Sequence, residues 1–130
     1  MIAYEDPSAA IDWLTEAFGF RERGERYVME DGTIGHAELA LDDHVVMLAT
    51  PSPDYQSPKT HRETCEAADR WLDNPWVVDG LLVLVADLDA HHARAVEAGV
   101  NVIRAPEEGP DGRLYTAEDL EGHRWMFQQA

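Results

Sequence analysis

The segment His44-Val45-Val46-Met47-Leu48 has a counterpart about 80 residues later, His123-Arg124-Trp125-Met126-Phe127. Both begin with histidine and carry methionine at the fourth position. Asp31-Gly32 recurs in the same way as Asp111-Gly112. A repeat of this period predicts a fold built from two copies of one unit. Because neither copy is long enough to bury a core alone, we expect the copies to share a core, with a site between them.

A helix is predicted near the start of each copy. In the first copy Asp6-Pro7 suits the N-cap and first helical position, and Gly19 suits the end of the helix. In the second copy the helix is predicted at residues 89–98. It carries His91-His92 near its start, and we expect these two side chains in solvent or at a dimer contact.

Strand-like segments fill the rest of each copy. They cover residues 1–4, 21–29, 34–41 and 44–50 in the first copy, and residues 81–86, 101–105, 114–118 and 123–129 in the second. Each copy therefore reads β-α-β-β-β, and Glu38 recurs as Glu118. The predicted fold class is α+β, in one domain with a first module at 1–50, a joining segment at 51–79 and a second module at 80–130.

The joining segment has no counterpart in the repeat. Its prolines indicate a loop, followed by a short helix at residues 59–72 that places His61 and Cys65 on one face. Histidine and cysteine one turn apart can bind a metal. Because no further ligands accompany them at a suitable spacing, a packed face with a buried thiol is favoured.

Composition excludes several classes of partner. The net charge of −16, with a single lysine, opposes binding to nucleic acid or an anionic membrane. The charge fits either a solvated surface or a preference for cationic ligands. No apolar run approaches the roughly 20 residues of a membrane span, no signal peptide is evident, and Cys65 is the only cysteine. We expect a cytoplasmic protein.

The order of several short strings resembles that of the vicinal oxygen chelate (VOC) superfamily, the glyoxalase, bleomycin-resistance and dioxygenase group. The strings are Ala9-Ala10-Ile11-Asp12-Trp13-Leu14, Ala17-Phe18-Gly19-Phe20, Gly35-His36-Ala37-Glu38-Leu39, Asp87-Leu88-Asp89-Ala90-His91, Glu97-Ala98-Gly99 and Asp119-Leu120-Glu121-Gly122-His123. The resemblance implies two βαβββ modules that form a curved mixed sheet around a cavity, with helices on the convex side, and commonly a homodimer.

In enzymes of this family, the resemblance also implies a divalent metal held by one ligand from the first and one from the last strand of each module. Those positions fall on Met47, Gly80 and Met126, and the fourth falls before Met1. A thioether is a poor ligand for a hard divalent ion, and glycine has no side chain. We therefore expect no metal and no cofactor, as in the antibiotic-sequestering members.

Strand alternation predicts which side chains face the cavity. The predicted binding residues are His36, Glu38, Met47, Leu82, Leu84, Thr116, Glu118, Arg124 and Met126. His36 and Glu38 are also the catalytic candidates, because a histidine oriented by a carboxylate is a suitable general base. Glu118 could hold a cationic group, or Arg124 an anionic one. The alternative is that His36, Glu38 and Glu118 only form hydrogen bonds with one another or with the backbone of an edge strand.

The favoured function is metal-independent binding of an amphipathic small molecule between the two modules, in a homodimer that binds neither nucleic acid nor membrane. The alternative is a VOC-type lyase, isomerase or transferase. It would use His36 and Glu38 as an acid-base pair, or rebuild a metal site from His36, Glu38 and Glu118. A third possibility is a degenerate copy that serves as a subunit of a hetero-complex.

Overall fold

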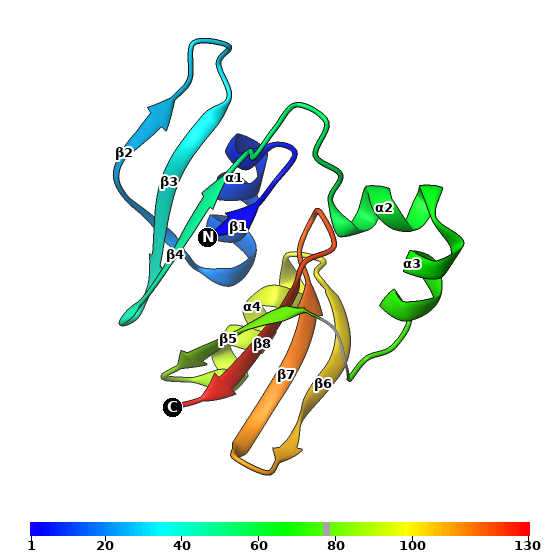
Figure 1. Ribbon diagram of the computed structural model, residues 1–130. Helices are drawn as coiled ribbons and strands as arrows, with labels where there is room; N and C mark the ends of the chain where they lie inside the picture. Colours follow the sequence, from blue (N-terminus) through cyan, green and yellow to red (C-terminus); the bar gives the residue numbers. More distant parts are fainter. Residues whose placement is uncertain (77–78) are drawn as a thin grey trace.

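The structure is a computed structural model that describes residues 1–76 and 79–130. The predicted joining segment includes residues 77–78, which lie outside the described residues. The described chain forms two four-stranded sheets, with α1 against the first, α4 against the second, and α2 and α3 standing to one side (Figure 1). No described helix has both the length and the apolar character that crossing a membrane requires.

Each module repeats the same order of elements, so the α+β prediction with two βαβββ modules is confirmed. The elements are β1 Ile2–Ala3, α1 Pro7–Phe18, β2 Arg21–Val28, β3 Ile34–Leu41, β4 His44–Ala49, α2 Pro58–Thr64, α3 Glu66–Leu72, β5 Gly80–Val85, α4 Leu88–Glu97, β6 Asn101–Gly109, β7 Gly112–Glu118 and β8 Arg124–Gln129. The sheet orders are β1-β4-β3-β2 and β5-β8-β7-β6. In each sheet the first pair is parallel and the others are antiparallel.

The caps of α1 form as the sequence predicts, and Asp87 caps α4, which begins at Leu88, one residue before the predicted start. The Asp6 carboxylate accepts a hydrogen bond from the amide of Ala9 at 3.1 Å, and Asp87 does the same for Ala90 at 2.9 Å. Gly19 ends α1 with a φ of 78°, a left-handed conformation that glycine adopts without strain.

The strand ladders correct one detail of the repeat. Glu38 lies opposite Met47, whereas the residue opposite Met126 is Thr116. Thr116, and not Glu118, therefore occupies the place of Glu38 in the second module. The sequence match was misleading because the β2–β3 turn is longer than the β6–β7 turn. A shift of two residues leaves Glu118 on the same face of its strand.

The core is shared between the modules. Phe18, at the end of α1, packs against Trp125 and Phe127 of β8, with ring centroids 5.8 and 4.7 Å apart. One cluster of buried residues includes Leu39 and Leu48 of the first sheet together with these β8 side chains. The helix-side faces of both sheets therefore contribute to a single core.

A buried carboxylate joins the two modules. Asp119 Oδ2 accepts hydrogen bonds from the hydroxyl of Tyr4 at 2.6 Å and the indole N–H of Trp125 at 3.0 Å. Its other oxygen accepts from the amides of Glu121 and His123, both at 3.0 Å. Burial, and next the charge of Asp119, raise the pKa of Tyr4, which keeps its hydroxyl protonated as a donor. Asp119 thus shapes its own turn and fixes the end of β1 at the same time.

The turns between the last two strands make reciprocal contacts. The Glu121 carboxylate accepts from the amides of Glu5 and Asp6, at 2.6 and 3.0 Å, just before α1. In the other direction, Asp42 accepts from the amide of Ala86, just before α4, at 3.4 Å. Burial raises the pKa of Glu121, while the two amide donors oppose that rise. Each module therefore supports the helix start of the other.

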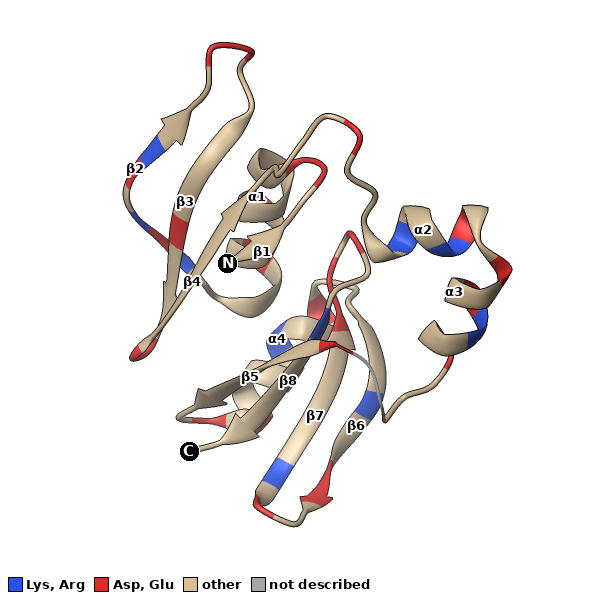
Figure 2. Ribbon diagram, viewed as in Figure 1, with Lys and Arg blue, Asp and Glu red and all other residues tan. Residues whose placement is uncertain are grey.

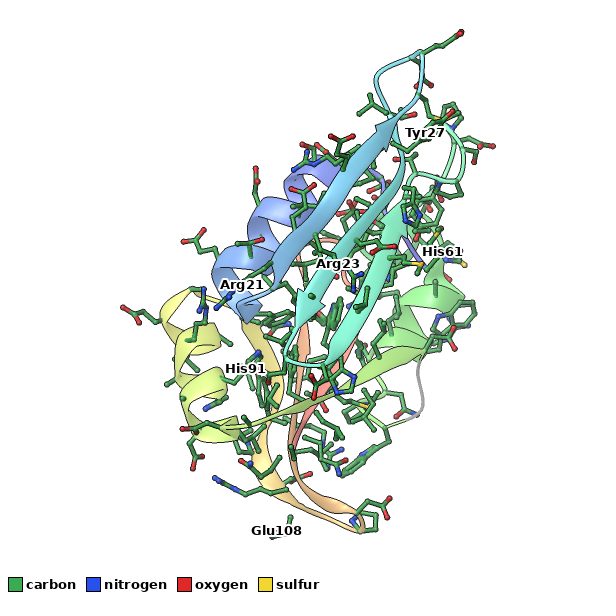
Figure 3. The ribbon with its side chains drawn as sticks, turned by 90° about the vertical axis from the view of Figure 1, so that its left-hand side faces the viewer. Arg21, Arg23, Tyr27, His61, His91 and Glu108 are labelled. Carbon is green, nitrogen blue, oxygen red and sulfur yellow. The ribbon has the colours of Figure 1, made fainter. Side chains whose placement is uncertain are left out.

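The prediction that His91 lies in solvent or at a dimer contact is wrong. Its Nε2 donates to the carbonyl of Phe18 at 2.8 Å, and its Nδ1 accepts from the hydroxyl of Tyr115 at 2.7 Å. The ring lies on the inner side of α4 (Figure 3). Burial is the main cause that lowers the pKa of His91. A neutral imidazole therefore bridges α1 and β7.

The prediction of one helix at residues 59–72 is also wrong. Two helices form, α2 and α3, because Cys65 has an extended backbone, with φ −140° and ψ 110°. His61 and Cys65 therefore do not share a helical face. Ala68 is buried and Cys65 is half-buried.

The burial of His91 predicts a pH-dependent stability. Because the pKa of His91 is lowered in the folded state, the unfolded state binds the proton more readily. The stability that the neutral ring contributes is therefore complete above about pH 6.5 and is lost as the pH falls below that value. His91→Gln should lower stability at pH 7.5 by ~1–3 kcal/mol, the cost of lost buried hydrogen bonds. It should also flatten the decline in the free energy of unfolding between pH 7.5 and 5, measured by urea unfolding.

His92→Gln is the control. It keeps the hydrogen bonds of His91 to Phe18 and Tyr115, so its stability should change with pH as in the wild type. A steep decline in His91→Gln would contradict this assignment.

Candidate functional site

All nine predicted binding residues lie on the faces of the two sheets that point away from the shared core, which we call the open faces. Their strand neighbours Ala37, Leu48, Val83, Tyr115 and Phe127 are buried in the core. Side chains alternate along a strand, so the residues between them face the other way. The alternation that the sequence predicted is therefore confirmed.

One chain does not bring the nine residues together. His36, Glu38 and Met47 lie on the open face of the first sheet, and the other six lie on that of the second. The helix-side face of each sheet points toward the shared core, so the open face of each sheet points away from it. The two open faces therefore do not enclose a common cavity around the nine residues. The predicted site is thus divided into two half-sites within the chain.

The half-site on the first sheet is built around Glu38. Its carboxylate contacts Arg23 Nε at 3.2 Å and His36 Nε2 at 3.3 Å. Arg23 and Tyr27 project from β2 next to β3, and Tyr27 lies opposite His36 in the ladder (Figure 3). Met47, opposite Glu38, is 39% exposed. The arrangement combines an imidazole–carboxylate pair with an accessible thioether.

The half-site on the second sheet is partly covered by the joining segment. Arg124 is only 3% exposed, and its guanidinium donates to the backbone carbonyls of Leu72 and Asn74. Its Nε lies 3.6 Å from Glu118 Oε1. The sequence offered Arg124 as a group for an anionic ligand, but this side chain is engaged in holding the joining segment on the sheet.

A second arginine extends that cover. The guanidinium of Arg104 lies over the ring of Trp76, 3.6 Å from its centroid, in cation–π geometry, and also pairs with Glu107. Arg104 is opposite Thr116 in the ladder, and Thr116 is buried. Leu82 remains accessible at the far side of the sheet, with 54% of its surface exposed.

The cover leaves a cavity of about 860 Å³ between the joining segment and the start of β8, which we call the join cavity. It is lined by Tyr55, Gln56, Pro58, His61, Trp71, Leu72, Trp76, Asp79, Gly122, His123 and Arg124. Of the predicted binding residues it includes only Arg124. The sequence signal that could have found it was the pair of tryptophans, Trp71 and Trp76, in a segment outside the repeat.

A smaller cavity of about 320 Å³ is lined by residues that include Trp13, Arg62 and Glu118. The Glu118 carboxylate already accepts a hydrogen bond from Asn101 at 3.1 Å. Acidic residues concentrate at the turns and loops of both modules, whereas several arginines lie along β2 and the joining segment (Figure 2).

The donor groups at the family's metal positions do not fit a divalent ion. Met47 and Met126 offer thioethers, and a side-chain carbon at Gly80 would lie 3.0 Å from the methyl group of Met126. Within residues 1–76 and 79–130, no group of three His, Cys, Asp or Glu side chains is placed to hold a metal. His36, Glu38 and Glu118 are therefore not assembled into a metal site within one chain.

The model of the Glyoxalase/Bleomycin resistance protein/Dioxygenase superfamily matches residues 1–127. The chain belongs to this superfamily. The match covers both modules and the joining segment, so the resemblance predicted from the short sequence strings is confirmed.

Individual relatives agree with the family. An uncharacterised protein of Mycobacterium bovis is 30% identical, over 98% of this chain and 79% of its own length. The crystal structure of TioX from Micromonospora sp. ML1 superposes with a TM-score of 0.71 at 32% identity, covering 99% of this chain and 91% of TioX. TnmS3, an antibiotic binding protein from Streptomyces sp. CB03234, has a TM-score of 0.68 at 23% identity, covering 98% and 89%.

The role of Arg124 can be tested by loosening the joining segment. Arg124→Met removes the donors to Leu72 and Asn74, so amide hydrogen exchange across α3 should speed up by roughly tenfold or more, equivalent to ~1.4 kcal/mol of local stability. Arg124→Lys should restore only part of the protection, because one ammonium replaces a planar fork of donors. Arg113→Met, which breaks an exposed ion pair with Asp89, is the control and should leave α3 unchanged. Unchanged amide hydrogen exchange across α3 in Arg124→Met would contradict the role of Arg124 in holding the joining segment on the second sheet.

Proposed function

We propose that this protein binds an amphipathic small molecule without a metal, and that a homodimer completes the binding site from the open faces of its modules. The observation that carries the proposal is the pair of methionines, Met47 and Met126, at the family's metal positions on those faces. Thioether side chains are flexible and polarizable, and they suit contact with an apolar or aromatic ligand better than coordination of a hard ion.

The open faces have the composition of a ligand site. They combine exposed apolar groups, Met47, Leu82 and Leu84 among others, with polar groups such as His36 and Glu38. Small-molecule sites typically combine an apolar lining with a small number of polar groups that orient the ligand. Each face is one side of a sheet, so a ligand bound to a single face would stay largely in solvent.

A second copy of the chain would supply a surface that covers a ligand bound to one open face. Leu82 and Leu84 are 54% and 37% exposed on the second sheet, and Val45 and Met47 are exposed on the first. An exposed apolar surface of this kind marks an interaction site. A two-fold axis would place the first module of one protomer opposite the second module of its partner, so that His36 and Glu38 face the sheet surface that exposes Leu82 and Leu84 in the other chain. A single cytoplasmic domain of 130 residues would be the protomer.

The relatives support the choice of test ligands. TnmS3 shares the fold and is an antibiotic binding protein, although at 23% identity the likeness extends to the fold alone. Antibiotics are therefore a reasonable first set of compounds, and cationic ones a reasonable first subset, because the chain carries a net charge of −16.

Native mass spectrometry of the purified protein, without chelator, tests the proposal. We expect twice the chain mass, with an organic adduct retained from the cell or taken up from a panel of antibiotics and metabolites. Addition of zinc, nickel and manganese should not give a stoichiometric metal adduct. Met47→Lys should reduce both dimer and adduct, because it places a charge on the open face. A ligand-free monomer, or one metal per chain, would contradict the proposal.

A second candidate function, acid-base catalysis, is favoured by the contact between His36 and Glu38 at 3.3 Å. An enzyme of this kind would convert the bound compound, and His36→Ala should slow conversion by roughly 10²–10⁴-fold, the usual contribution of a positioned base. Conversion is followed by mass spectrometry of the released compound, with His92→Ala as control. Equal conversion by His36→Ala and wild type would remove His36 from the chemistry.

A further inference from the structure

The join cavity lies largely outside the open faces, and its volume of about 860 Å³ falls in the range of small-molecule sites. Only Arg124 belongs both to this cavity and to the predicted binding residues. The cavity is formed within one chain, since α2, α3 and residues 73–76 lie against the start of β8. It therefore has a lining of its own whose chemistry can be read separately.

Aromatic rings dominate that lining. Trp71 and Trp76 are 53% and 68% exposed, although tryptophan is usually covered. Trp76 is held by the Arg104 guanidinium on one side, and Trp71 meets the His61 ring edge-on at 6.0 Å. Tyr55 adds a third aromatic wall. Several ring surfaces at one opening provide stacking positions for a planar ligand.

One carboxylate in the lining, that of Asp79, is exposed at the opening of the cavity. Asp79 has no ion-pair partner among the described residues. The single guanidinium in the lining, that of Arg124, is buried, donates to two carbonyls and lies close to Glu118. The His123 ring is engaged too, because its Nε2 donates to the carbonyl of Ala3 at 2.7 Å. A cationic ligand would thus meet the Asp79 carboxylate, the Trp71 ring and the face of Trp76 opposite the Arg104 guanidinium.

We propose that the join cavity binds a planar aromatic cation, which stacks on Trp71 and Trp76 and pairs with Asp79. This inference goes beyond the proposed function, because it assigns a second binding site, formed within one chain and largely outside the open faces, together with the chemical class of its ligand. An aromatic anion is disfavoured by Asp79 and by the overall charge, and a small aliphatic cation would leave the ring walls without contact.

Isothermal titration calorimetry with three probes tests the assignment. Proflavine is a planar tricyclic cation, 9-anthracenecarboxylate is an anion of similar shape, and tetraethylammonium is a cation without an aromatic ring. We expect proflavine to bind once per chain, at least tenfold more tightly than the other two. Equal binding of proflavine and 9-anthracenecarboxylate would overturn the proposal.

Variants separate the cavity from non-specific attraction to an acidic protein. Trp71→Ala and Trp76→Ala should each weaken proflavine binding about tenfold, and both side chains are exposed enough for the fold to persist, which circular dichroism checks. Asp79→Asn should weaken it about threefold or more, the scale of an exposed ion pair. Asp43→Asn makes the same charge change in the exposed β3–β4 turn and should leave binding unchanged. Equal effects of Asp79→Asn and Asp43→Asn would overturn the proposal.

Met47→Lys distinguishes failure of this inference from failure of the proposed function. It alters the open face of the first sheet and leaves the join cavity intact, so proflavine binding should persist. Loss of proflavine binding in Met47→Lys, with none in Trp71→Ala, would place the ligand on the open faces, which retains the proposed function and overturns the inference. Absence of binding by any probe, together with a ligand-free monomer in native mass spectrometry, would overturn both.

Discussion

The structure depends most on the carboxylate of Asp119. It is buried, yet each of its oxygens accepts two hydrogen bonds, from Tyr4, Trp125 and the backbone of its own turn. A buried charge is tolerated only when donors replace its hydration. These donors come from both modules, so the final turn of the second module is tied to the residue that follows β1 in the first. The position of β8, and with it the start of the join cavity, follows from this arrangement.

The two modules have the same architecture but offer different surfaces. Position by position in the ladders, Arg124 of β8 corresponds to Val45 of β4. The arginine holds the joining segment over the second sheet, whereas the valine leaves the first sheet uncovered. One substitution in a repeated strand thus accompanies the difference between the partly covered open face of the second sheet and the uncovered open face of the first. A ligand would meet tryptophan rings beside the joining segment at one module and an exposed thioether at the other.

Much of the fold could be predicted from the sequence, because its signals are local. The caps at Asp6 and Gly19 and the strand alternation around Ala37 follow from neighbouring residues. The interior role of His91 could not be predicted, since its partners Phe18 and Tyr115 are distant in the sequence and only the packing of α4 brings them near. The division of the site into two half-sites was also not predictable, because alternation gives the face of each sheet but not the direction in which that face points. The break at Cys65 lacks a proline or glycine signal.

The contact between Tyr4 and Asp119 also limits how a duplicated chain can assemble. By the ladder register, Leu41 takes the place of Asp119 in the first module and Val85 takes that of Tyr4 in the second. Val85 belongs to the apolar core, and Leu41 packs against it. If two first modules from different chains exchanged partners, each Tyr4 hydroxyl would be buried against leucine with no acceptor, at a cost of ~1–3 kcal/mol per site. The contact between Tyr4 and Asp119 has no counterpart at the other pair of positions. It therefore favours the packing of a first module against a second module, and disfavours domain-swapped aggregates in which two first modules pack together.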